Sequence, residues 1–265
     1  MSRGLLSKSV REEIDRSLPQ SGDLRSLSLE LSPDLLAMKF GPGNTIPVAS
    51  VAFQDCTGTL AEVRYALCEY LAHGRYYRRA RHITDEYTAV FFERYYLDDA
   101  ALRLYAAGEQ LAAAVVLMKR ISGDDLAPYR KKHSSDQAVL GAYLEKKKDR
   151  DPLAATLLAL AESDDWKFAA SYRNRWVHEQ PPTMAGRGLI YRRRPRWKVS
   201  ADGKKKFLSV RTGDQPEYNV PTVAKHILGA HKKFIAAVQM AFDSYLQVLE
   251  ASGVRRTESG FVVTL

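Results

Sequence analysis

The stretch PTVAKHILGAHKKFIAAVQMAFDSYLQVLE, which runs from Pro221 to Glu250, decides the fold class. Its apolar residues recur every three or four positions, the spacing that gathers side chains on one face of an α-helix. They are Val223, Ile227, Ala230, Phe234, Ala237, Val238, Ala241, Tyr245 and Val248. The sequence therefore predicts a long closing helix and, with it, a mainly helical protein.

Helical spacing also covers several stretches that precede this helix. The first begins at a cap supplied by Thr57 or Thr59, and the second covers residues 84–121, where we allow for a break around Asp98. Ser122 and Gly123 end that second helix. Further helices are predicted at residues 135–147, 152–161 and 166–178, and the prolines at 181 and 182 must stop the last of them.

Two segments depart from helical spacing. Residues 1–56 combine a short leucine alternation at 27, 29 and 31 with prolines and glycines, which predicts an irregular N-terminal extension with one or two short strands. Residues 187–213 contain three short apolar runs, at 189–191, 197–199 and 207–210, and Asp202-Gly203 supplies a turn. We therefore expect an antiparallel helical bundle over residues 57–265, with a basic β-hairpin inserted at about 187–213.

The composition is that of an ordinary folded domain, with 45% hydrophobic and 27% charged residues. The longest strongly apolar run, Leu111 to Met118, is far shorter than the ~20 residues that cross a bilayer. Residues 1–10 do not look like a secretory signal, so we expect a cytoplasmic protein without a membrane span. Cys56 and Cys68 do not have the spacing of a redox pair or a zinc knuckle, and we expect neither a metal nor a cofactor.

The net charge of +9 favours polyanionic partners where the basic residues are clustered. One cluster lies at residues 75–81, where arginines alternate with Tyr76 and Tyr77. Cations with interleaved aromatic rings hold single-stranded RNA without reading its sequence. The alternative is a solvated surface, which we expect for the lysine runs at 146–148 and 204–206. The second cluster lies in the predicted hairpin and comprises Arg192, Arg193, Arg194, Arg196, Trp197 and Lys198.

The candidate catalytic residues lie in the segment SDDWKFAASYRNRWVHE, residues 163–179. Projected at about 100° per residue, it separates into an apolar arc, which includes Trp176 and Val177, and a polar arc. Arg173 falls inside the apolar arc, where a guanidinium is costly unless it is paired or reaches a wet cleft. His178 lies in the last turn, where it suits proton exchange near neutral pH. The alternatives are an arginine that ties helices together and an ordinary surface histidine.

The pattern Arg173-Asn174 followed by His178, on a late helix and succeeded by prolines, resembles the signature of the HEPN superfamily. The resemblance covers this motif and the helical scaffold over residues 59–251. It implies a HEPN-like bundle and a metal-independent endoribonuclease that cuts RNA through the ribose 2′-hydroxyl. Arg173 would stabilise the charge on the scissile phosphate, His178 would act as general acid or base, and Asn174 would orient them.

The resemblance also implies partners. HEPN ribonucleases usually act as dimers, and their relatives include toxins and phage-defence effectors, so we expect RNA, a second copy of the chain and an antitoxin or regulatory protein as partners. On an ideal helix Arg173 and His178 point about 140° apart. Either the arginine bends round, the helix end distorts, or a second subunit completes the site, and we favour the dimer. Arg175 and the hairpin cluster would supply further RNA contacts.

Two other interpretations stay open. The first is a non-catalytic HEPN-like module that binds RNA, a nucleotide or a protein through the same basic surface. The second is a structural helical domain of another family, in which Arg173 forms a buried ion pair with a carboxylate from another helix. The candidates for that carboxylate are Glu62, Glu69 and Glu109.

Overall fold

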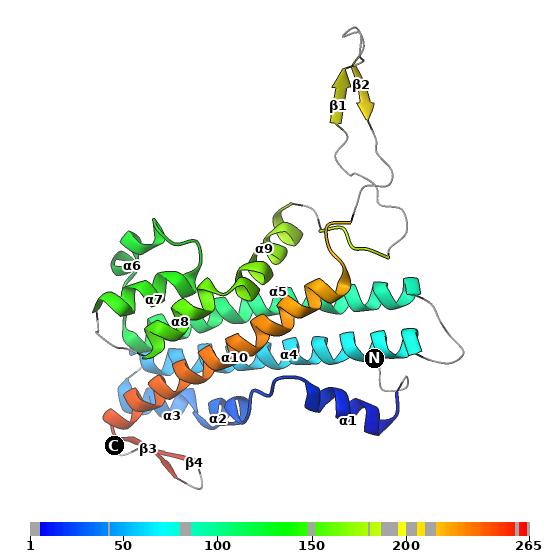
Figure 1. Cartoon of the computed structure of the whole chain (residues 1–265). Coiled ribbons are helices and arrows are strands. Elements are labelled where there is room, and N and C mark those ends of the chain that lie inside the picture. The colour runs from blue at the N-terminus through cyan, green and yellow to red at the C-terminus, as the bar shows by residue number, and fades with distance from the viewer. Residues whose placement is uncertain are drawn as a thin grey trace.

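The computed structural model describes residues 6–41, 43–79, 86–147, 152–179, 181–186, 196–199, 206–209, 216–257 and 260–263. Within this part of the chain the fold is a helical bundle with two short hairpins (Figure 1). The helices are α1 Lys8–Ser17, α2 Leu24–Glu30, α3 Pro33–Phe40, α4 Thr45–Arg79, α5 Glu86–Lys119, α6 Gly123–Arg130, α7 Asp136–Lys147, α8 Pro152–Glu162, α9 Asp164–His178 and α10 Val220–Ala251. The strands are β1 Arg196–Val199, β2 Lys206–Ser209, β3 Val254–Thr257 and β4 Gly260–Val263.

The antiparallel pair α4 and α5 forms the centre of the bundle, and α10 packs across it (Figure 1). The predicted apolar face of α10 is confirmed, because its residues are buried except Val248, which is half-buried against the core. The ring of Phe53 in α4 meets those of Phe242 and Tyr245 at centroid distances of 5.4 and 5.1 Å. The Tyr245 hydroxyl donates to the carbonyl oxygen of Ile46 at 2.7 Å. Aromatic packing and one buried hydrogen bond thus join the closing helix to α4.

The N-terminal segment is helical, so the prediction of an irregular extension with strands is wrong. Two of its prolines stand at helix starts, where a missing N–H costs nothing. Pro33 opens α3 behind the cap Ser32, and Pro47 lies in the first turn of α4. Because α4 begins at Thr45, Thr57 is inside that helix and not a cap. Its hydroxyl lies 2.8 Å from that of Ser28 in α2, a contact that holds the two helices together.

Three other differences from the sequence prediction concern helix boundaries and strands. Helix α5 continues through Asp98 without a break. Ser122 does not end α5 but caps α6, a helix that was not predicted, through a capping box with Asp125. Strands β3 and β4 pair in antiparallel register, and this pair was also missed.

The strands predicted at 197–199 and 207–210 are confirmed. Strands β1 and β2 pair in antiparallel register, with Trp197 opposite Leu208. The predicted strand at 189–191 and the turn at Asp202-Gly203 lie outside the described residues.

Helix α5 contains the run from Leu111 to Met118 and is, among the described helices, the one long and apolar enough to cross a membrane. A core helix of a globular bundle passes the same test. In this structure α5 packs against α4, α7, α9 and α10, and its buried residues extend from Ala89 to Met118 and include charged Glu93 and Arg94. Its place in the bundle accounts for its apolar character.

Candidate active site

Helix α9 carries the motif, and its first turn is held firmly against the bundle. The Ser163 hydroxyl caps the helix by accepting from the Trp166 amide at 3.2 Å. The Trp166 ring stacks on Phe234 of α10 with centroids 5.4 Å apart. On its other side it fills the space at Gly108 of α5, where an added Cβ would lie 2.9 Å from the indole. The start of α9 is therefore wedged between α5 and α10.

The residue before Arg173 ties the middle of α9 to α5. Tyr172 is 2% exposed, and its hydroxyl donates to Asp98 Oδ1 at 2.5 Å. Arg94 Nε donates to the other oxygen of the same carboxylate at 3.2 Å. Burial first, and then the Asp98 carboxylate, raise the pKa of Tyr172 far above its ordinary value, so the phenol stays protonated and remains a donor. The backbone from which Arg173 projects is thereby fixed.

The last turns of α9 extend beyond the helices that cover its start. The apolar arc is buried at Trp166, Ala169 and Tyr172, as predicted, but Trp176 and Val177 are 36% and 46% exposed. Asn174 and His178 are exposed as well. The apolar arc is therefore buried only over the first part of α9, and at its end the helix rises away from α5 (Figure 1). The motif therefore lies on an accessible helix end.

The three motif residues meet at this helix end. Arg173 Nη1 donates to Asn174 Oδ1 at 3.0 Å and lies 3.4 Å from His178 Nε2. A contact of this kind requires the neutral imidazole to carry its proton on Nδ1. One chain therefore brings together the guanidinium and the imidazole that the motif predicts.

The arginine bends round to reach His178. The side chains start about 140° apart on a regular helix, and the helix ends at His178, followed by Glu179, whose φ of −123° and ψ of −105° are not helical. A second subunit is not needed to bring the two groups together, so the geometric reason for expecting a dimer is withdrawn.

The half-buried Arg173 has an aromatic partner that was not predicted. Its Cζ lies 4.2 Å from the ring centroid of Tyr105 in α5, within the range of a cation–π contact. Two of the carboxylates considered as partners have other contacts, since Glu62 pairs with Arg103 and Glu69 lies 3.4 Å from His73. The contact with Tyr105 explains how a guanidinium is tolerated within the apolar arc.

Arg175, predicted to contact RNA, faces a carboxylate. Its Nη1 lies 2.5 Å from Glu217 Oε2, and its Nε lies 3.9 Å from Glu179. The hydrogen bond that Arg175 donates to Glu217, with a smaller contribution from Tyr218, raises the pKa of Arg175. The pair joins α9 to the segment before α10, so an RNA phosphate would have to compete with Glu217 for this guanidinium.

The remaining residues predicted to contact RNA belong to the hairpin cluster. Arg192, Arg193 and Arg194 lie outside the described residues. Arg196, Trp197 and Lys198 form most of β1, whose backbone is described but whose side chains are not.

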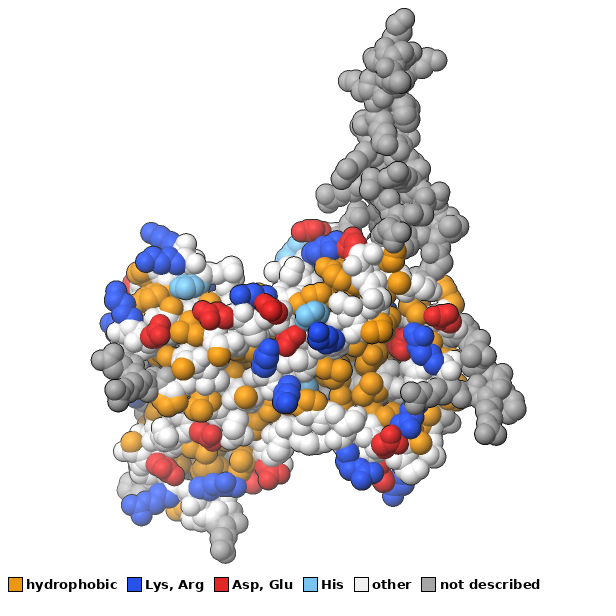
Figure 2. Space-filling model, viewed as in Figure 1, with side chains coloured by type: hydrophobic (Ala, Val, Ile, Leu, Met, Phe, Trp, Pro, Cys, Tyr) orange, Lys and Arg blue, Asp and Glu red, His pale blue; other side chains and the backbone are white. Residues whose placement is uncertain are grey.

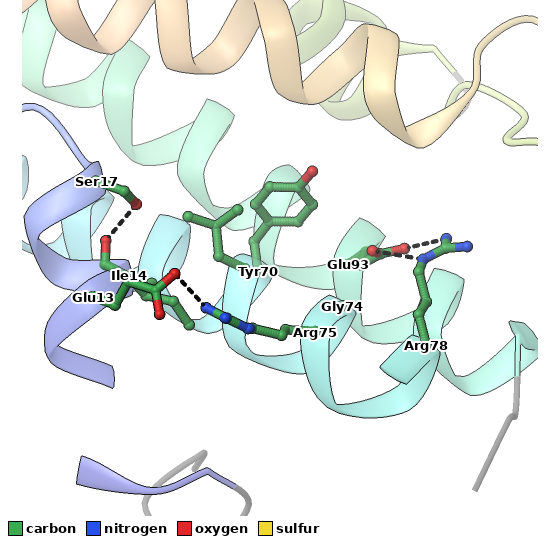
Figure 3. Close-up of a pocket in the computed structure, with 9 residues that line it drawn as sticks. Glu13, Ile14, Ser17, Tyr70, Gly74, Arg75, Arg78 and Glu93 are labelled. Carbon is green, nitrogen blue, oxygen red and sulfur yellow. Dashed lines mark hydrogen bonds and ion pairs between the residues drawn. The ribbon is translucent and has the colours of Figure 1, made fainter. Parts of the chain in front are cut away.

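Two arginines of the cluster at residues 75–81, Arg75 and Arg78, are paired with carboxylates. They border a pocket of about 310 Å³ between α1 and the α4–α5 pair (Figure 3). Arg78 donates to both oxygens of Glu93, at 3.1 and 2.7 Å, and Arg75 lies 3.0 Å from Glu13. On the face shown in Figure 2, basic side chains likewise lie among acidic ones. The side chains of Arg79 and Arg81 are not among those that the structure describes.

Metal ligands do not gather at the motif. Within the described part of the chain, no three histidine, cysteine or acidic side chains lie close enough together to hold a metal ion. Comparisons of the chain with protein-family models, with curated proteins and with solved structures find no match.

Proposed function

We propose that this protein is a metal-independent endoribonuclease of HEPN type, with Arg173, Asn174 and His178 as its catalytic residues. The observation that supports the proposal is the 3.4 Å contact between Arg173 and His178 on an exposed helix end. A histidine beside a guanidinium suits phosphoryl transfer in RNA, because the 2′-hydroxyl is an internal nucleophile and needs only proton transfer and charge stabilisation.

Each of the three residues has a distinct task in this reaction. His178 accepts the proton of the 2′-hydroxyl as that oxygen attacks the neighbouring phosphorus. Arg173 stabilises the negative charge that builds up on the phosphoryl oxygens, and Asn174 holds the guanidinium in place through its Oδ1. The bond from phosphorus to the 5′-oxygen breaks and this oxygen takes a proton from water, which leaves a 2′,3′-cyclic phosphate and a 5′-hydroxyl. DNA, which lacks the nucleophile, is not a substrate.

The proposal includes partners as well as a reaction. RNA is the substrate, and a second copy of the chain is the expected companion in the cytoplasm, in a toxin or defence setting with an antitoxin or regulatory protein. Trp176 and Val177, exposed beside the motif, are apolar side chains that a second copy would cover. Such a dimer would bring two complete sites side by side.

The test compares two histidine variants in a chelator. Purified wild-type protein is incubated with total RNA in EDTA beside His178→Ala and, as a matched control, His133→Ala on the loop between α6 and α7. We expect His178→Ala to lose about 100-fold or more of the cleavage rate, the usual contribution of a general acid or base. His133→Ala should cleave as the wild type does.

Two results separate this proposal from a non-catalytic module. A binding module would show no cleavage by the folded wild-type protein. A catalytic domain should keep its RNA affinity and its thermal unfolding temperature in His178→Ala while losing the reaction.

A further inference from the structure

Arg173 reaches His178 although the two side chains start on different sides of α9. Positions five residues apart point about 140° apart on a regular helix. The guanidinium nevertheless lies 3.4 Å from the imidazole, with its Cζ over the ring of Tyr105. The ring comes from α5, a different helix, and forms a surface on which the guanidinium rests.

We propose that Tyr105 is the positioning residue of the candidate site: its ring holds the Arg173 guanidinium beside Asn174 and His178. This inference rests on the proposed function for its consequence in catalysis, but not for the contact itself. Tyr105 does not enter the reaction. It acts through Arg173 alone.

The ring of Tyr105 is well placed to act as a fixed support. Two contacts hold α9 against α5, one on each side of Tyr105 along α5. Three residues further along α5, the backbone at Gly108 is covered by the Trp166 indole. About two helical turns earlier in α5, the Asp98 carboxylate accepts a hydrogen bond from the Tyr172 hydroxyl at 2.5 Å. Because both anchors are buried, the distance between the Tyr105 ring and the backbone of Arg173 is set by the packing of the core.

The contact uses the face of the ring and not its hydroxyl. A guanidinium is attracted to the negative face of any aromatic ring. Phenylalanine at position 105 should therefore replace tyrosine, whereas leucine, of similar bulk but without a π-face, should not. This contrast separates positioning from simple filling of space.

Tyr143 offers a matched control elsewhere in the bundle. It is also a half-buried tyrosine under a cation, with Lys147 Nζ 5.7 Å from its ring centroid, and it lies in α7. Tyr143→Leu removes a comparable ring and a comparable contact without touching α9.

The experiment compares full-length wild type with Tyr105→Phe, Tyr105→Leu and Tyr143→Leu by two readouts. The first is the NMR signal of the Arg173 Nε–H group in protein labelled with ¹⁵N-arginine, assigned with Arg173→Lys. The ring current of residue 105 should shift this signal in wild type and Tyr105→Phe, and Tyr105→Leu should lose the shift. The second is RNA cleavage in EDTA. We expect Tyr105→Leu to lower kcat by about 10- to 100-fold with little change in KM, as misplacement of a catalytic group does.

The two readouts keep the two ideas distinct. An Arg173 signal that is the same in wild type and Tyr105→Leu overturns the positioning role, whatever the activity. A loss of kcat in Tyr143→Leu equal to that in Tyr105→Leu overturns it as well. If the folded wild-type protein cleaves no RNA, the proposed function fails, and the shift of the Arg173 signal alone decides whether Tyr105 positions the arginine.

Discussion

At the scale of single residues, the sequence predicted that the cationic Arg173 lies among apolar side chains. It did not predict which residue accommodates the charge. The helical projection placed a guanidinium in an apolar arc, which indicated a partner. The partner is Tyr105, whose ring lies 4.2 Å from the Arg173 Cζ. That contact depends on how α5 and α9 cross, and no local pattern in the sequence reports the crossing. His178 was recognisable because its position at a helix end is a local property.

His231 gives the fold a pH dependence. It is 0% exposed, and both ring nitrogens lack a hydrogen-bond partner within the described residues. Burial, and then the charge of Arg64, lower the pKa of His231 from 6.5 to about 4. Between these values the unfolded chain binds the proton and the folded chain does not, so stability is complete above about pH 6.5 and falls as the pH drops towards 4.

His231→Leu should remove this part of the pH dependence. We expect the free energy of unfolding of the variant to fall less than that of wild type between pH 7 and pH 4, by on the order of 1–3 kcal/mol. Urea unfolding at several pH values measures the difference. His73, whose pKa burial also lowers, is present in both proteins and cancels. Parallel curves for the two proteins would show that His231 is not the titrating group.

At the scale of elements, helices were predicted where the apolar spacing is regular. They were missed where capping residues set the helix boundaries. The spacing located α5, α7, α8, α9 and α10 within a few residues. The N-terminal helices were not predicted because proline and glycine were treated as helix breakers. In the structure Pro33 begins a helix and Gly41, with a φ of +86°, follows the end of the same helix, so both residues mark helix boundaries.

The junction between α9 and α10 depends on a glycine. Asp165 Oδ1 lies 2.9 Å from His226 Nδ1, and its Oδ2 accepts from Lys233 at 2.7 Å. Hydrogen bonds and charge from these two residues outweigh desolvation and lower the pKa of Asp165. A Cβ at Gly229 would lie 2.4 Å from Asp165 Oδ2, so the carboxylate fits only against glycine.

Two glycine-to-alanine variants should therefore act in opposite directions. Gly229→Ala displaces Asp165 and should destabilise the protein by about 1–3 kcal/mol, as overpacking does. Gly58→Ala, inside α4 with nothing within 4 Å of the added Cβ, should stabilise it by about 0.5–1 kcal/mol through helix propensity alone. Thermal unfolding measures both. A Gly229→Ala protein as stable as Gly58→Ala would contradict the close packing at this junction.

At the scale of the whole molecule, the sequence predicted a helical bundle but not the arrangement of its helices. From the sequence we favoured a site that a second subunit completes. Arg173 and His178 of one chain already lie 3.4 Å apart, so each chain of a dimer should carry a complete site.

A mixed dimer tests this directly. Arg173→Ala and His178→Ala chains with different tags are co-expressed and purified through both tags. We expect the mixed dimer to cleave no RNA, because neither chain holds both groups. Activity near half that of wild type would show that the two residues act across subunits, and a failure to recover any doubly tagged protein would remove the dimer from the proposal.

The central claim is that the cluster of Arg173, Asn174 and His178 breaks RNA with the 2′-hydroxyl as nucleophile and without a metal. The most direct measurement follows cleavage of one oligonucleotide, in its ribose and its 2′-deoxy forms, by wild type and His178→Ala in EDTA, with the product ends identified by mass. We expect wild type to cut only the ribose form and to leave 2′,3′-cyclic phosphate ends, and His178→Ala to cut neither form. Cleavage of the deoxy form, cleavage by His178→Ala at the wild-type rate, or an inert wild-type protein would rule out this mechanism.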